Sequence, residues 1–285
     1  MKTTRSFTKK DIVVVLVCVI FLVINVGAIS SSGRRRTKRA VCLTNLKQLT
    51  LAWTQYADDN DGKIVNGAPL GPTTCQAYTP TGYDEHANET PWVGRDWSNG
   101  YSMGISLPKE CQASAIRDGA LWPYCQDLKL YYCPSGCLGG IRSYSIVDGM
   151  NGMSRGTIAG VHWIKNMTQI LNPSERLVFI DEGWVTPDSY GVNFDRALWW
   201  DVCIGYKVVT GVVIFADGHS EWHRWKGKWT VAYGLATFGI HPQTFYPPGT
   251  MLPDGTIVPA SIDDYHDLYW IQIGCWGKLG YTPSY

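Results

Sequence analysis

The stretch FADGHSEWHRW, Phe215 to Trp225, gathers the side chains best suited to chemistry. His219, Glu221 and His223 alternate along it, so in a β-strand all three lie on one face. Imidazole and carboxylate groups bind zinc and other divalent metals. Alternate residues of a strand are about 7 Å apart, however, and the preceding strand offers no coordinating side chain at the facing positions. We therefore predict a solvated or hydrogen-bonded polar face and no metal, with a site formed by His219, Glu221 and His223 as the alternative.

Asp217 and Gly218 predict the turn that positions these side chains. An Asp-Gly pair between two strand-like runs is typical of a two-residue type I′ hairpin, in which both central residues have positive φ. The expected register places Ala216 opposite His219, Phe215 opposite Ser220, Ile214 opposite Glu221, and Val213 opposite Trp222. Phe215 and Trp222 are then core residues, and the histidines lie on the other face.

No other catalytic pattern is evident in the sequence. A nucleophile elbow, a P-loop, an HExxH helix and a dinucleotide fingerprint are all missing. Asp181 and Glu182 end a predicted strand, but neighbouring strand residues point to opposite faces, so we expect them to be ordinary carboxylates, with a calcium ligand or a structural hydrogen bond as the alternative. The net charge of +1 gives no indication of nucleic-acid binding. We therefore predict no enzymatic activity, no cofactor and no nucleic-acid partner.

The cysteine content favours an oxidising compartment. Of nine cysteines, Cys18 lies in an apolar run and eight remain. No CxxC pair occurs, so the spacing of a zinc ribbon is missing. Disulfides outside the cytoplasm are the favoured interpretation, and free buried thiols are the alternative.

The elements that carry these residues begin with an apolar N-terminal segment. Residues 1–10 form a basic tail or leader, and residues 11–29 are long and apolar enough for a transmembrane segment. A cleaved signal peptide ending near Ala28 is the alternative. Residues 30–62 continue as an amphipathic helix, and Gly62 is placed for a left-handed C-cap. Its apolar seam consists of Cys42, Leu46, Leu49, Trp53 and Tyr56.

Residues 63–285 read as a β-rich globular domain. The runs ERLVFIDE, KVVTGVVIFA and SEWHRW predict strands, and Asp254-Gly255 predicts a further hairpin turn. A short helix is expected in ASAIRDGALWPYC, ending near Pro123. Residues 66–110 and 226–265 are predicted to be long loops or insertions.

Several stretches in order along the chain resemble type IV pilins and type II secretion pseudopilins, specifically the large pilin-like proteins of planctomycetes. The matching stretches are KRAVCLTNLKQLTLAWTQYADDNDGKI, GALWPYCQDLKLYYCPS, RSYSIVDGMNG, NPSERLVFIDE, FADGHSEWHRW and DLYWIQ. This resemblance implies an α+β, pilin-like fold: a long N-terminal helix, half membrane and half amphipathic, packed on an antiparallel sheet with large loop insertions. It makes Cys42 and Cys133 the first pair to expect in a disulfide between helix and domain. The family has a histidine nine residues before the Asp-Gly pair, where this chain has Lys207.

The function implied by the resemblance is that of a structural subunit. Its N-terminal helix would pack with copies of itself or with other pilin-like subunits, after residence in the inner membrane, with the domain in the periplasm or in an extracellular filament. Processing after Ser6 would make Phe7 the first residue, and Asp11 would pair with the amine of a neighbouring Phe7. Lys9 and Lys10 replace apolar residues of the family, so an uncut anchor remains the alternative.

The high aromatic content leaves a second function open. The chain has 13 Trp and 16 Tyr, which usually serve cores and interfaces but also form sugar sites. The alternative is a membrane-anchored module outside the cytoplasm that does not polymerise. It would bind a glycan or another ligand through Trp-rich loops such as TPWVGRDWSNGY and RALWWDV, the second of which contains Trp199 and Trp200.

Overall fold

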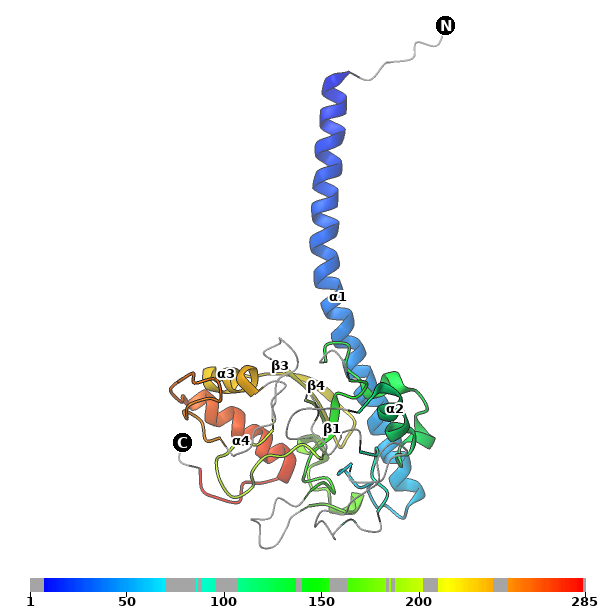
Figure 1. The fold of residues 1–285 in the computed structure, drawn as a ribbon, viewed down its shortest axis with the longest axis vertical. Coiled ribbons are helices and arrows are strands. Elements are labelled where there is room, and N and C mark those ends of the chain that lie inside the picture. The colour runs from blue at the N-terminus through cyan, green and yellow to red at the C-terminus, as the bar shows by residue number, and fades with distance from the viewer. Residues whose placement is uncertain are drawn as a thin grey trace. The chain divides into compact units, whose positions relative to one another are not determined.

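A computed structural model describes residues 8–69, 86, 89–95, 107–136, 140–153, 163–182, 185, 188–201, 210–237 and 246–283 (Figure 1). Side chains 25–32 are outside this description. The chain divides into two compact units, residues 1–40 and 41–285. Helix α1, Lys9–Asp59, contributes residues to both units. The 3₁₀ turns are η3 (Trp122–Tyr124), η4 (Leu128–Tyr131), η5 (Met167–Gln169) and η6 (Pro173–Glu175).

The sheet of the second unit is an antiparallel meander in the order β1-β2-β3-β4. Its strands are β1 (Tyr144–Ile146), β2 (Leu177–Asp181), β3 (Thr210–Phe215) and β4 (Ser220–Arg224). β2 and β3 are central, and all five residues of β2 are buried, so both of its faces are covered. The strands expected in ERLVFIDE and SEWHRW, and the described part of the strand expected in KVVTGVVIFA, are present.

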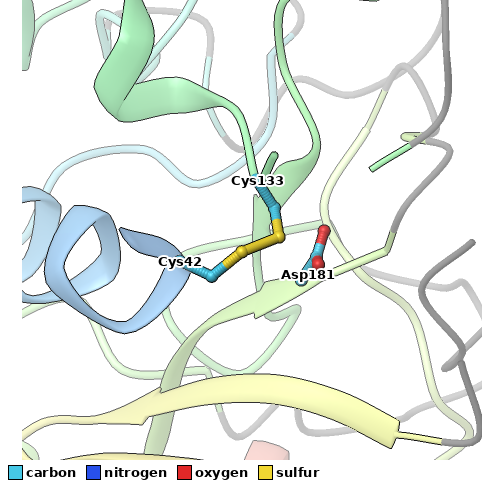
Figure 2. A group of neighbouring side chains, drawn as sticks. All are labelled: Cys42, Cys133 and Asp181. Atoms are coloured by element: carbon cyan, nitrogen blue, oxygen red, sulfur yellow. A yellow bond between two sulfur atoms is a disulfide. The ribbon is translucent and has the colours of Figure 1, made fainter. Parts of the chain in front are cut away.

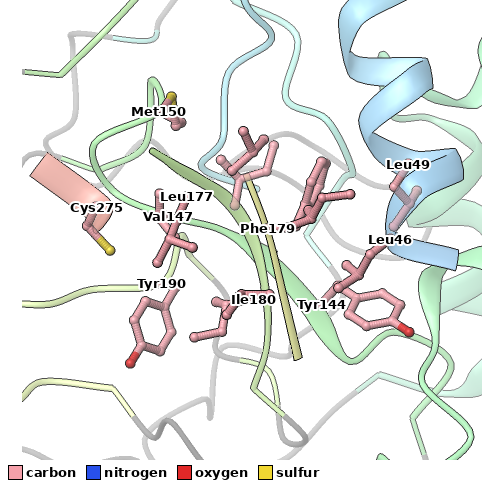
Figure 3. Close-up of a cluster of buried hydrophobic side chains, with 14 of the residues drawn as sticks. Leu46, Leu49, Tyr144, Val147, Met150, Leu177, Phe179, Ile180, Tyr190 and Cys275 are labelled. Atoms are coloured by element: carbon pink, nitrogen blue, oxygen red, sulfur yellow. The ribbon is translucent and has the colours of Figure 1, made fainter. Parts of the chain in front are cut away.

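The second part of α1 supplies one wall of the core. Cys42, Leu46, Leu49 and Trp53 are fully buried, and Tyr56 is half-buried, so the seam expected from the sequence faces inward. Figure 3 shows Leu46 and Leu49 beside side chains of the sheet. The helix ends where the Gly62 amide donates to the Ala57 carbonyl at 2.8 Å, with Gly62 at φ +77° as expected of a left-handed cap.

Besides the sheet, the described part of residues 63–285 contains helices α2 (Lys109–Arg117), α3 (Lys228–Thr237) and α4 (Ile262–Trp276). α2 overlaps the short helix expected in ASAIRDGALWPYC, but it begins earlier and ends at Arg117, well before Pro123. α3 lies within the region expected to be a long loop, residues 226–265. Two carboxylates of α4 hold the first turn of α3. Asp264 accepts from the Thr230 amide at 2.8 Å, and Asp267 accepts from the Lys226 and Gly227 amides at 2.8 Å each. Such carboxylates satisfy amides that a helix N-terminus leaves unpaired.

The chain is therefore an α+β protein in which helices and an antiparallel sheet share one core. Whether the arrangement is a pilin fold stays a prediction. No helix among the described residues has a stretch both long enough and apolar enough to cross a membrane. The segment expected to do so, residues 11–29, lies in α1, and its side chains from 25 onward fall outside the description.

Candidate functional site

The β3–β4 hairpin forms where it was expected, but its turn and register differ from the prediction. Ile214 pairs with Ser220 and Val213 with Glu221, one position away from the expected register. The Phe215 amide donates to the His219 carbonyl at 3.0 Å, so three residues, 216–218, form the loop. Of these only Gly218 has positive φ, at +85°. Three-residue loops with one left-handed glycine are the next commonest hairpin after the two-residue type.

The Asp217 side chain explains the longer loop. Its Oδ1 accepts from the His219 amide at 3.0 Å, an Asx turn that fixes the backbone without a second positive φ. The same oxygen lies 2.6 Å from Nδ1 of His219. Burial opposes ionisation of Asp217, but the hydrogen bonds from His219 outweigh it and lower the pKa of the carboxyl. Asp217 therefore sets the turn.

The shift of one residue changes which side chains share a face. His219 stacks on Phe215, with ring centroids 4.2 Å apart, although the sequence placed them on opposite faces. Trp222 pairs with Val212, not Val213. The separation into a Phe215–Trp222 core face and a histidine face was therefore wrong.

His223 is a packing residue. Its ring stacks on Trp270 of α4 at 3.6 Å between centroids and meets the edge of Trp225 at 4.6 Å. Burial, reinforced by the positive charge of Lys226, lowers the pKa of His223 to about 4, so the ring is neutral at pH 7. Nδ1 lies 3.5 Å from Oε1 of Glu221.

The three candidate ligands of the hairpin do not converge on one point. Among the described residues, His219, Glu221 and His223 are not a group whose ligand atoms lie within reach of a single ion. Nδ1 of His219 is engaged by Asp217, and the ring of His223 is held by aromatic contacts. The arrangement can therefore stabilise the hairpin but offers no metal centre.

The N-terminal site residues are only partly described. Ser6, Phe7 and Lys207 lie outside the described residues. Asp11 begins α1 with a reciprocal cap: its Oδ2 accepts from the Thr8 amide at 2.9 Å and from the Thr8 hydroxyl at 2.7 Å, while its own amide donates to that hydroxyl at 3.3 Å. A carboxylate at this position is a common helix-start device. Asp11 thus has a role within its own chain.

The part of α1 that follows presents an apolar surface. Twelve large apolar side chains between Ile12 and Ile24 are 50–67% exposed. Because they are nearly consecutive, they cover every side of the helix. An all-round apolar helix is normally covered by other chains or by other apolar surroundings.

Cys42 of α1 and Cys133 are joined by a disulfide, the pair that the resemblance suggested first (Figure 2). Cys111 is also disulfide-bonded. Cys125 and Cys275 are free and buried, so the alternative of buried thiols holds for these two. Burial raises the pKa of both thiols, which makes them poor nucleophiles.

Asp181 lies beside the disulfide, a neighbour that the sequence did not suggest. One ligand atom from each of Cys42, Cys133 and Asp181 falls within 4.8 Å of the others, and all three residues are buried. Cys42, Cys133 and Asp181 are far apart along the chain, so no local sequence pattern predicts that they lie close together. Glu182 is not part of this group, and its carboxylate accepts a hydrogen bond from the Ser145 hydroxyl at 2.6 Å.

Trp199 and Trp200, which were proposed for glycan binding, differ in burial. Trp199 is fully buried and packs edge-on against Trp225, with centroids 5.8 Å apart. Trp200 is half-buried, and its carbonyl accepts from the Tyr233 hydroxyl at 2.9 Å. A fully buried indole cannot stack on a sugar, so the expectation for Trp199 was wrong.

Comparisons with protein family models, with curated proteins and with solved structures give no match.

Proposed function

We propose that this chain is a structural subunit that assembles through the N-terminal part of α1, with copies of itself or with pilin-like partners, into a filament. The observation that carries the proposal is the apolar surface between Ile12 and Ile24. Fully burying one Val, Leu or Ile side chain contributes about 1.5–3 kcal/mol, so covering twelve half-exposed ones is worth on the order of 10–20 kcal/mol. That gain matches or exceeds the cost of association, about 4–15 kcal/mol.

Two further features support the proposed location, one for the compartment and one for the membrane stage. The Cys42–Cys133 bond and the bonded Cys111 suit an oxidising compartment. Both ends of the apolar surface carry positive charge, Lys9 and Lys10 before it and Arg34 to Arg39 after it, which suits the two headgroup layers of a membrane but does not set an orientation. We propose the inner membrane before assembly, and the periplasm or an extracellular filament afterwards, as the location. The rival function, glycan binding, loses the contribution of Trp199, which is fully buried.

Electron microscopy of the purified full chain after detergent removal tests the proposal. Filaments with a regular repeat are expected. The double variant Val15→Asp with Val19→Asp should abolish them, because two charges would enter the apolar contact. The matched control Gln48→Asp with Gln55→Asp places the same charges on an exposed face of the same helix and should leave filaments intact. Dispersed chains or amorphous aggregates from the wild type, or filaments from the Val15/Val19 variant, contradict the proposal.

A further inference from the structure

The triad formed by Cys42, Cys133 and Asp181 places two sulfurs and a carboxylate in one buried space (Figure 2). Cys42 comes from α1, Cys133 follows η4, and Asp181 ends β2. The three ligand atoms lie within 4.8 Å of one another. Two thiolates and one carboxylate form a donor set that zinc uses in proteins. While the two sulfurs are bonded to each other, neither is a thiolate and the set is incomplete.

The elements around the triad are held by contacts that do not depend on the S–S bond. The Asn45 side-chain amide, on α1, donates to the Lys129 carbonyl at 3.1 Å and to the Tyr132 carbonyl at 3.0 Å. The Cys133 amide donates to the Ser143 hydroxyl at 2.8 Å. Breaking the disulfide would therefore leave α1 and the segment that carries Cys133 tied together, with both sulfurs close to each other.

Asp181 is fixed from the sheet. It pairs with Tyr144 in the β1–β2 ladder, and the Tyr144 hydroxyl lies 3.5 Å from the Cys42 carbonyl. The carboxylate is thus held next to the sulfurs by strand pairing. The Ser135 amide donates to Sγ of Cys133 at 3.4 Å, a contact that favours a negative charge on this sulfur.

We propose that the reduced form of the chain binds one thiophilic divalent cation, best matched by zinc, through Cys42, Cys133 and Asp181. Reduction by a dithiol or a phosphine breaks the S–S bond: two electrons enter, each sulfur takes one proton, and the reductant is oxidised. The cation then displaces both thiol protons to solvent. Reduction leaves two buried sulfurs, and a bound cation compensates the charge of the two thiolates that form when their protons leave.

The bound cation and the disulfide exclude each other, because both need the same two sulfurs. The chain then has two forms, one cross-linked and metal-free, the other a dithiol that holds metal and resists oxidation. The three described free thiols, Cys18, Cys125 and Cys275, belong to no comparable group of ligand atoms among the described residues. Sγ of Cys125 is hydrogen-bonded to the Leu121 carbonyl at 3.2 Å and to the Tyr131 hydroxyl at 3.1 Å, and Cys18 is exposed on the helix.

Metal binding to the full chain, measured without oxygen before and after reduction by a phosphine, tests this site. We expect one equivalent of zinc in the reduced chain only, and a sulfur-to-cobalt charge-transfer band when cobalt replaces zinc. Asp181→Asn keeps both cysteines, so it can be purified in its cross-linked form before reduction. Loss of its ligand should weaken zinc binding by about tenfold or more, since even outer-shell changes cost about 10–100-fold.

Two control variants separate the triad from the exposed free thiol of Cys18 and from the sulfur that reduction releases at Cys111. Cys18→Ser and Cys111→Ser should leave the stoichiometry and affinity unchanged. Less than a tenth of an equivalent of bound zinc in the reduced wild type overturns the proposal. The same holds if circular dichroism shows that the reduced chain is unfolded and that zinc does not refold it. Zinc binding by Asp181→Asn that equals the wild type overturns it as well.

Discussion

Replacing Cys42 and Cys133 together by alanine should lower the free energy of unfolding by about 4–5 kcal/mol. The disulfide closes a loop between residues separated by 91 positions, and the chain-entropy relation gives about 15.5 cal/mol/K, or about 4.6 kcal/mol at 25 °C. The effect acts through the unfolded chain, which gains conformations when the cross-link is lost. The buried seam of α1 and the two Asn45 hydrogen bonds remain, so the variant should still fold.

Urea unfolding followed by tryptophan fluorescence measures the change. The matched control is Cys125→Ala with Cys275→Ala, which also removes two buried sulfurs but no described cross-link. The Cys42/Cys133 variant should lose clearly more stability than this control, and its dependence on urea should steepen because the unfolded chain exposes more surface. Equal losses in the two double variants, with equal urea dependence, would refute the entropic argument.

Three further perturbations have defined outcomes. Leu46→Ala should cost about 2–5 kcal/mol in chemical unfolding, because it opens a cavity where the side chain is fully buried; a loss under 1 kcal/mol would contradict this packing. Gly218→Val should cost about 1–3 kcal/mol, since a β-branched residue is strained at φ +85°, and an unchanged melting temperature would count against the loop geometry. Burial raises the pKa of Asp267, so the folded chain binds this proton more tightly than the unfolded chain and loses stability as pH rises from about 4 through the raised pKa. In Asp267→Asn this loss is absent, so the stability of the variant relative to the wild type should increase from pH 4 to pH 7; a decrease would contradict the sign.

The parts of the fold that sequence could predict depend on regular local patterns. The buried seam from Cys42 to Trp53 follows from helical spacing, and Gly62 marks the helix end. The hairpin strands follow from their apolar and aromatic content. The turn was predicted less well because an Asp-Gly pair fits both two-residue and three-residue loops. The choice between them depends on the hydrogen bond that the Asp217 side chain accepts from the His219 amide. That difference of one residue reverses the faces of β4.

The helices beyond the sheet show where local reasoning fails and where it was incomplete. α3 contains Gly234 and β-branched residues, and its first turn is held by Asp264 and Asp267 of α4, which are 34 to 41 residues away along the chain from the amides that they bind. No sequence pattern within residues 226–237 predicts that Asp264 and Asp267 bind this turn. α4, in contrast, has readable signals: Ser261 and Asp264 form a capping box, and Gly277 ends the helix in the left-handed region.

The position of the Cys42–Cys133 bond has a mechanical consequence. Cys42 is the second residue of the compact unit that begins at Val41, so it is almost the first point at which the chain enters that unit. Tension applied to the preceding part of α1 reaches this covalent bond before it reaches most of the buried seam. A pulling force is therefore transmitted through the disulfide to the segment at Cys133. This covalent bond is stronger than the hydrogen bonds and apolar contacts around it, so the part of α1 that follows Cys42 stays packed on the core.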